Sequence, residues 1–350
     1  MLTPPSTLQI TLQGRTAIAG LTRDMATAST ELSSGLRANP YADLGMDAAR
    51  SLDLRNQIAR TDTYTTQNQV LTGRLETQLG ALDALGDLGR EVLALALNDG
   101  ASGGQAGAAL ADTARATLDT LRATLDASHG GRHLFSGAAE DTGPLQAVDA
   151  ASPATGLSPQ EIVGDIVGAG PADAADAASK IAALDAVFAS ATGTDQDFEA
   201  SFYNGADAGA PRQGAFIAEG EWITFGVQAN DKPVRDLVQG LMMVSTADPD
   251  TIADPDARAA WMDKATALMA SGVEGIDAAR TDTGRTIGRV EAAIQTAQDR
   301  ADLYRDAVVD IEGVDPAEAA TRVKLLEGQL QASYATTTRM ANLSILNFMR

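Results

Sequence analysis

Both ends of this 350-residue chain carry amphipathic helical patterns, and these constrain the fold more than any other feature. Apolar residues recur at alternating spacings of three and four, which places them on one face of a helix and is typical of a coiled coil. The first stripe consists of Ile18, Leu21, Met25, Ala28 and Leu32, and the second of Val323, Leu326, Leu330, Tyr334, Ala341, Ile345 and Phe348. Such stripes need a partner that covers them. We therefore predict that these residues form an assembly interface, in which the two ends pack against each other and against copies of the chain.

Conformational entropy supports this interpretation. Ordering one residue costs roughly 1–2 kcal/mol, whereas burying one large apolar side chain returns roughly 1.5–3 kcal/mol. A terminal helix with one apolar residue in every three or four cannot offset that cost by contact with a single surface. We expect the ends to be loosely ordered in a free monomer and to fold when subunits assemble.

The charge of the chain excludes two classes of partner. The formal net charge is −21, which repels nucleic-acid phosphates and anionic membrane surfaces, so neither nucleic acid nor membrane is an expected partner. Residues 1–40 carry +1 and residues 317–350 carry +2, so that residues 41–316 carry the remaining −24. Near-neutral ends can pack closely with copies of themselves, whereas an acidic middle would stay in solvent.

Proline positions divide the chain into helical flanks and a different middle. None of the twelve prolines lies within 41–143 or 256–315, and eight lie between Pro144 and Pro255. The flanks predict three helices that bundle together: one through the leucine-rich stripe from Leu71 to Leu95, one at about 105–128, and one at about 256–309. We predict terminal coiled-coil assembly segments at 1–40 and 317–350, a helical rod domain at 41–143 and 256–316, and an inserted domain at 144–255.

The middle segment holds seven of the fourteen aromatic residues. Short alternating runs at 199–203, 213–218 and 222–228 predict a small antiparallel sheet. Helical turns expected at 158–167 and 171–189 would pack on that sheet. The predicted fold is therefore mainly α: a long helical rod with paired terminal coiled-coil helices and a small, solvent-facing α+β module inserted into it.

No combination of residues predicts a catalytic, cofactor or metal site. The chain has no cysteine, which removes disulfides, iron–sulfur clusters and cysteine nucleophiles. His129 and His133 have the spacing of two helical zinc ligands, but Gly130 and Gly131 lie between them and the chain has no third histidine. With 47 acidic residues, a solvated face is the default interpretation of any carboxylate pair. We predict no enzyme activity, no cofactor and no bound metal.

Targeting signals are also missing from the sequence. Residues 1–5 contain neither a basic region nor an apolar region of the kind found in secretory signals. No apolar run is long enough to span a bilayer. We expect that, if the protein leaves the cell, it does so without a cleaved signal peptide.

Several motifs resemble those of the bacterial flagellin family. One motif resembles the family's amino-terminal signature: it is the run Glu31-Leu-Ser-Ser-Gly-Leu-Arg-Ala-Asn, followed by Asp47-Ala-Ala-Arg and a long helix. Its carboxy-terminal rod helix resembles Gly284-Arg-Thr-Ile-Gly-Arg-Val-Glu, and its final segment resembles Met340-Ala-Asn-Leu-Ser-Ile-Leu-Asn-Phe-Met. A sequence typical of hook–filament junction members is similar to Gly131-Arg-His-Leu-Phe-Ser-Gly.

The resemblance implies a mechanical role. The terminal helices would form the inner tube of an axial structure, the rod domain would pack around it, and the inserted module would face solvent. Members of the family leave the cell unfolded through the flagellar type III export apparatus, guarded by a cytoplasmic chaperone on the carboxy-terminal helix. The resemblance therefore implies an extracellular location in the flagellum. The implied partners are copies of the chain, neighbouring axial proteins (another hook-associated protein and flagellin) and an export chaperone.

Three functions remain open from the sequence. The first is a hook-associated protein that joins hook to filament, and the second is a filament flagellin that polymerises without limit. The third is an unrelated helical enzyme such as a cell-wall hydrolase, against which the lack of a convergent catalytic set argues. The tract 131–137 favours the first over the second.

Overall fold

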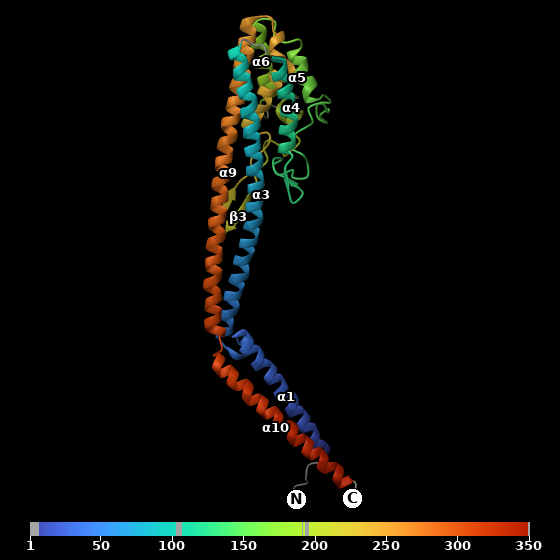
Figure 1. The fold of residues 1–350 in the computed structure, drawn as a ribbon, viewed down its shortest axis with the longest axis vertical. Coiled ribbons are helices and arrows are strands. Elements are labelled where there is room, and N and C mark those ends of the chain that lie inside the picture. Colours follow the sequence, from blue (N-terminus) through green and yellow to red (C-terminus); the bar gives the residue numbers. More distant parts are fainter. Residues whose placement is uncertain (1–6, 103–106, 191, 193–195, 349–350) are drawn as a thin grey trace. The chain divides into compact units, whose positions relative to one another are not determined.

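The computed structural model describes residues 7–102, 107–190, 192 and 196–348, and it is mainly α-helical (Figure 1). Contacts divide the chain into two compact units, one made of residues 1–63 with 296–350 and the other of residues 64–295. Two helices, α3 (Asp47–Ser102) and α9 (Pro255–Glu312), contribute to both units.

The first unit contains both ends of the chain. Its other elements are α1 (Thr7–Ser34), the short α2 (Pro40–Asp43) and α10 (Pro316–Phe348). Helices α1 and α10 lie side by side, although they come from opposite ends of the sequence (Figure 1). The ends therefore already pair within the single chain, in contrast to the expectation that they fold only when subunits assemble. Gly35 ends α1 with φ of +70°, and its N–H donates to Glu31 O at 2.9 Å. Glycine suits this position because it adopts the left-handed conformation without a Cβ penalty.

The second unit builds its core from long and short helices. The short elements are α4 (Gly107–Leu125), α5 (Pro159–Val167), α6 (Ala174–Val187), α7 (Phe198–Ser201), α8 (Lys232–Thr246) and a 3-10 turn at Pro249–Thr251. Helix α8 is buried along most of its length and packs on α9 so closely that a Cβ at Gly272 would lie 2.8 Å from the backbone N of Leu237. Trp261 on α9 and Phe135 are fully buried in this core.

Two small hairpins complete the second unit. Strand β1 (Ser128–His129) pairs with β2 (Arg132–His133), and β3 (Gly214–Ala218) pairs with β4 (Glu221–Thr224), both antiparallel. The inner face of the β3–β4 hairpin carries Ile217 and Ile223, which are buried in a second apolar cluster with residues of α3 and α9. The period-2 pattern of the hairpin thus matches one buried and one exposed face.

The helical predictions are confirmed, as are the hairpin and the helical turns of the middle segment, whereas one predicted strand is wrong. Residues 199–203 do not form a strand, because Phe198–Ser201 form α7. Asp197 caps this helix by accepting a hydrogen bond from Ala200 N at 3.1 Å. Phe198 and Phe202 then stack with ring centroids 5.1 Å apart, a contact that the helical spacing of four permits and strand alternation does not.

Among the described residues, every helix is too short or too polar to qualify as a membrane span.

Candidate assembly surface

The predicted apolar stripe of α1 faces α10 in part. Ala28 is buried, and Ile18, Leu21 and Met25 are half-buried. Leu32, the last residue of that stripe, is 39% exposed. The stripe therefore meets its intramolecular partner along its middle and remains open at one end.

The stripe of α10 is divided in the same way. Leu326 and Leu330 are buried and Val323 is half-buried, whereas Tyr334 is 55% exposed. The backbone of Ala341, Ile345 and Phe348 belongs to α10, but their side chains lie outside the described residues. The proposed contacts of these three side chains remain a prediction.

Apolar side chains also remain in solvent on the paired helices. We call them the outer residues: Leu12 and Leu32 on α1, with Leu325 and Tyr334 on α10. Leu325 is 59% exposed although the adjacent Leu326 is buried, so the two leucines of α10 face in different directions. Pairing of α1 with α10 leaves the outer residues available to another chain.

A backbone clasp joins the end of α1 to the connection between α9 and α10. Leu36 forms an antiparallel bridge with Gly313. Arg37 N donates to Glu312 O at 2.9 Å, and Val314 N donates to Gly35 O at 3.0 Å. The residues that resemble the flagellin amino-terminal signature therefore hold the two terminal helices together where both begin to pair.

The side chain of Glu312 ties this clasp to α3. It is only 1% exposed, and its carboxylate accepts hydrogen bonds from Ser51 Oγ and from both Nε and Nη2 of Arg55, the first of these Arg55 bonds at 3.0 Å. The Arg55 guanidinium, and secondarily the Ser51 hydroxyl, lower the pKa of Glu312 against the opposing effect of burial. Glu312 therefore stays ionised at neutral pH and fixes α3, α9 and the clasp relative to one another.

A second buried carboxylate supports the other side of the clasp. Glu31, on the last turn of α1, is 5% exposed and accepts a hydrogen bond from Ala38 N at 3.3 Å. Arg322 of α10 lies 3.8 Å from its carboxylate. The glutamate that opens the signature motif thus shapes the turn after α1 and contacts α10.

Sequence reasoning missed Ser51, Arg55 and Glu312. A signal for two of them was present, because Glu312 lies four residues after the buried Val308 on α9, and Ser51 lies on the buried face of α3. Polar residues that occupy the apolar phase of a helix need buried partners. The pairing itself joins residues far apart in sequence, and periodicity alone cannot identify it.

Two more polar residues occupy the buried face of α3. Asn68 Nδ2 donates to Ile217 O at 2.7 Å, and Gln78 Nε2 donates to Leu134 O at 3.2 Å and to Val227 O at 3.1 Å. Leu134 belongs to the tract 131–137, in which Leu134 and Phe135 are both buried. The tract that resembles junction proteins therefore serves packing within the second unit.

The two histidines lie in a hairpin and not on one face of a helix. They occupy β1 and β2 on either side of a turn in which Gly130 and Gly131 have positive φ. His129 Nδ1 lies 3.2 Å from Thr77 Oγ1, and His133 Nδ1 lies 3.2 Å from the Asp126 carboxylate. Within the parts of the chain that the structure describes, no three His, Cys, Asp or Glu side chains gather in a way that could hold a metal ion.

Comparison with known proteins agrees with this arrangement. Residues 6–140 match the family profile of the bacterial flagellin N-terminal helical region, and residues 266–349 match that of the bacterial flagellin C-terminal helical region. No curated protein matches the chain. A solved structure of a flagellar hook-associated protein from Vibrio parahaemolyticus is 12% identical, with a TM-score of 0.52 over 77% of this chain and 99% of that chain. At this identity the likeness shows the fold alone, and the predicted fold of long helices with a small inserted α+β module is confirmed.

Proposed function

The chain belongs to the bacterial flagellin family, and from that premise we propose that it joins hook to filament as a structural subunit of the flagellum. In this role it polymerises through its terminal helices and occupies the junction between two axial lattices. The protein acts as an extracellular mechanical adaptor with no catalytic step.

The observation that carries this proposal is the closed pairing of the two chain ends. Helices α1 and α10 cover each other's stripes around Ala28, Leu326 and Leu330, and the clasp at Leu36 and Gly313 fixes where the pairing begins. Such a pair presents a defined surface to a neighbour. Assembly then depends on the outer residues and on the last turns of α10 rather than on the residues already buried inside the pair.

The terminal segments 1–40 and 317–350 act as assembly segments in this proposal. The rod domain at 41–143 and 256–316 packs outside them, and the inserted domain at 144–255 stays in solvent. The outer residues would be exposed in an unassembled subunit, where apolar surface favours aggregation. An export chaperone that covers α10 before assembly removes that hazard until the subunit has left the cell.

A junction role is favoured over a filament role by the tract 131–137, whose sequence is similar to that of junction members. The likeness in fold to the Vibrio hook-associated protein is consistent with it but carries no functional argument at 12% identity. A filament flagellin is the alternative, since both family profiles that match describe flagellin regions. A hydrolase assay on peptidoglycan addresses the enzyme alternative, because turnover would refute a purely structural role.

Immunogold electron microscopy of intact flagella tests the proposal directly. The antibody is raised against residues 144–255, the segment expected to face solvent after assembly. Label confined to a band where hook meets filament supports the junction role, and label along the whole filament makes the protein a flagellin. Flagella that remain unlabelled, while a second antibody reaches their surface, contradict a flagellar role.

A further inference from the structure

The tract 131–137 and the residues after it join distant parts of the second unit. Four consecutive backbone carbonyls, those of residues 134–137, each accept a hydrogen bond from a residue far away in the sequence. The donors, in that order, are Gln78 Nε2 at 3.2 Å, Ala229 N at 2.9 Å, Ala206 N at 2.9 Å and Gln213 Nε2. The first donor belongs to α3, and the other three lie on either side of the β3–β4 hairpin. We call these flanking segments, residues 206–213 and 225–229, the stems of the hairpin.

Both stems approach the tract closely at Gly137. A Cβ at this position would lie 2.7 Å from Gln228 Nε2 and 3.2 Å from Ala206 Cβ, so that one close contact comes from each stem. The backbone at Gly137 also has φ of +63°, which favours glycine. A side chain at this position would therefore push the two stems away from the tract.

Glu140 adds a charged contact to these backbone bonds. Its side chain is 18% exposed, and its carboxylate pairs with Arg74 of α3 at 2.6 Å and with Arg132 of β2 at 3.0 Å. Gln213 Nε2 donates to the same carboxylate at 2.9 Å, and Gln213 Oε1 accepts a hydrogen bond from Arg74 at 2.6 Å. Glu140, Arg74 and Gln213 thus form a closed ring of partly buried side chains that joins the tract, α3 and the first stem. Hydrogen bonds that involve a charged group are about twice as strong as neutral ones, so this ring is the firmest attachment of the stem.

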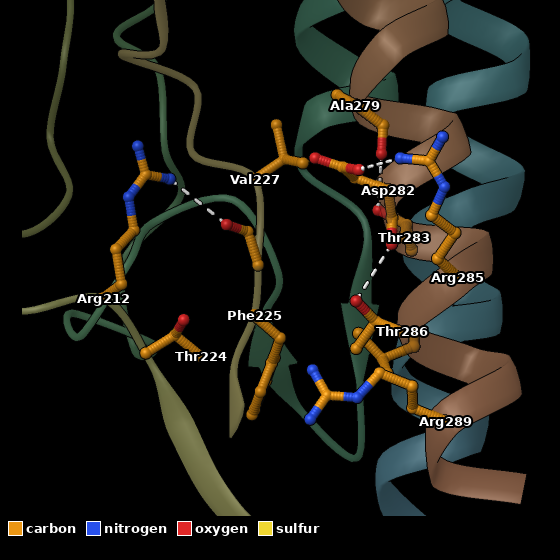
Figure 2. Close-up of a pocket in the computed structure, with 12 residues that line it drawn as sticks. Arg212, Thr224, Phe225, Val227, Ala279, Asp282, Thr283, Arg285, Thr286 and Arg289 are labelled. Atoms are coloured by element: carbon orange, nitrogen blue, oxygen red, sulfur yellow. Dashed lines mark hydrogen bonds and ion pairs between the residues drawn. The ribbon is translucent and has the colours of Figure 1, made fainter. Parts of the chain in front are cut away.

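The side of the stems that faces α9 offers little support. A groove of about 520 Å³ lies there, and Figure 2 shows Arg212, Phe225 and Val227 on the opposite side of it from Thr283 and Arg289 of α9. The inner face of the hairpin does rest on the second apolar cluster, beyond the groove. The hairpin is therefore held at two places: its strands by the apolar cluster and its stems by the tract.

We propose that residues 134–140 act as a clamp that positions the β3–β4 hairpin, with Glu140 as the positioning residue. The clamp keeps the inner face of the hairpin buried and fixes the direction of its half-exposed outer pair, Phe216 and Trp222, whose ring centroids lie 4.8 Å apart. Without the charge of Glu140 the stems loosen and the hairpin opens, while the core of α4, α8 and α9 stays closed. The clamp acts within one chain, so this inference does not depend on the proposed function.

Hydrogen exchange in the full-length monomer tests the role of Glu140. The test variant is Glu140→Gln, and the control is Glu219→Gln, which makes the same change in charge at an exposed turn of the hairpin. The Phe225 amide, which donates to Gln213 O at 2.9 Å, reports on the stems. We expect it to exchange about tenfold faster in Glu140→Gln, as the loss of a charged acceptor predicts, and at the wild-type rate in the control.

Amides of α8 distinguish opening of the hairpin from general loss of stability. They should exchange at the wild-type rate in both variants, because α8 lies in the core away from the stems. Equal exchange of the Phe225 amide in the two variants overturns the proposal. Faster exchange of Phe225 and of α8 by the same factor in Glu140→Gln also overturns it, because Glu140 would then stabilise the whole unit and not position the hairpin.

A single introduced thiol gives a second readout of the same opening. The chain has no cysteine, and Ala215 lies on the inner face of β3, partly buried against the second apolar cluster, so Ala215→Cys places a thiol there. We expect maleimide to react about tenfold faster with this thiol when Glu140→Gln is added, in proportion to the opening, and no faster when Glu219→Gln is added. Circular dichroism establishes that each variant is folded. Unchanged reactivity on adding Glu140→Gln overturns the proposal.

Two further variants test how the clamp is built. Gly137→Ala changes no charge, yet it should also speed exchange of the Phe225 amide, because its Cβ would contact both stems. Gln213→Ala combined with Glu140→Gln should open the hairpin no more than the stronger of the two single changes, because the ring acts as one contact. Wild-type exchange in Gly137→Ala shows that the stems do not close on the tract, and multiplied effects in the double variant show that Glu140 does not act through Gln213. Either result overturns the clamp.

Discussion

The carboxylate of Glu312 accepts a hydrogen bond from Nε of Arg55 at 3.0 Å, which joins the last turn of α9 to the early part of α3. Glu312 is almost fully buried, whereas the Arg55 side chain is 44% exposed. A buried carboxylate without donors would cost several kcal/mol, so the pair must stay closed while Glu312 stays ionised. The backbone on both sides of Glu312 belongs to the clasp with residues 35–37. This single side chain therefore controls how firmly the clasp is held to α3.

Replacing Glu312 with glutamine should loosen the clasp at neutral pH. The amide can still accept a hydrogen bond from Ser51, but it loses the charge that pairs with Arg55. We expect the free energy of local opening to fall by about 1–3 kcal/mol, because a charge-assisted hydrogen bond is lost. Water can rehydrate the partly exposed Arg55, and this limits the loss. Hydrogen exchange of the Arg37 and Val314 amides measures this effect. Asp302→Asn, which removes an exposed pair with Arg305, is the control and should leave both amides unchanged.

The contribution of Glu312 should depend on pH in a defined direction. Its pKa is lowered from the ordinary value of 4.5, chiefly by hydrogen bonds from Arg55 and also from Ser51. A carboxyl group with a depressed pKa in the folded state stabilises that state above pH 4.5, and this stabilisation is lost as pH falls through the folded-state pKa.

The difference between wild type and Glu312→Gln isolates this effect, because other carboxylates titrate equally in both proteins. We expect the difference in opening free energy to be constant from pH 7 to about 5 and to shrink at lower pH. A difference that grows as the solution is acidified would contradict the assignment.

Gly35 should tolerate no side chain without a cost in stability. Its φ is +70°, although no atom lies within 4 Å of the position that a Cβ would take, so the cost of Gly35→Ala comes from the backbone alone. We expect a loss of about 1 kcal/mol in the stability of the terminal pair. Gly20→Ala is the matched change, because Gly20 lies inside α1 with open space around it and alanine favours the helix. Thermal melts that move in the same direction for both variants would refute this interpretation.

The sequence predicted the long elements well and the contacts between them poorly. The stripes around Leu71 and Leu326 predict helices because periodicity of 3.6 residues is sustained over many turns. The run at 199–203 is too short for periodicity to distinguish a strand from a helical turn. In the structure Asp197 caps a helical turn there, which favours the helix over the strand. The buried face of α3 also carries the polar residues Asn68 and Gln78, whose amides donate hydrogen bonds to backbone carbonyls of distant segments. Residue type indicates that such side chains need a partner, and only the folded chain identifies it.

The predicted assembly interface stays a prediction, and helical spacing limited how finely the sequence could define it. The spacing of the stripes placed Ile18 to Leu32 and Val323 to Tyr334 on single helical faces, but it could not separate residues covered by the other terminal helix from those left open. Leu325, which lies outside the predicted stripe, is more exposed than any stripe leucine. The contact between α1 and α10 makes this distinction, because it covers Leu326 and leaves Leu325 in solvent.

The two tryptophans should report separately on the second unit. Trp261 is fully buried and its Nε1 donates to Met243 O at 3.2 Å, whereas Trp222 is 51% exposed beside Phe216 on the hairpin. Trp222→Phe should leave a blue-shifted emission that acrylamide quenches weakly, and Trp261→Phe should leave a red-shifted emission that it quenches strongly. We also expect Trp261→Phe to lower the stability of this unit by about 1–3 kcal/mol through the lost hydrogen bond and volume. Equal quenching of the two variants would contradict the burial of Trp261.

Adjacent leucines of α10 separate pairing within the chain from contact between chains. Leu326 is buried against α1, so Leu326→Asp, alone or with Leu330→Asp, places a carboxylate in an apolar contact and should destabilise the terminal pair by more than about 3 kcal/mol. Hydrogen exchange along α1 and α10 should then rise in the monomer, while emission from the buried Trp261 stays unchanged. Leu325 is 59% exposed, so Leu325→Asp should leave exchange in the monomer unchanged.

Assembly gives the decisive comparison between these variants. If the outer residues contact neighbouring subunits, Leu325→Asp should lower incorporation into flagella as Leu326→Asp does, although only the latter disturbs the monomer. Leu97→Asp provides a control, because Leu97 is 58% exposed on α3 in the second unit, outside the proposed terminal contact. Normal motility and incorporation with Leu326→Asp and Leu330→Asp together would show that assembly does not require the terminal pair. Normal incorporation of Leu325→Asp alone would instead place the contact between copies on another face of α10.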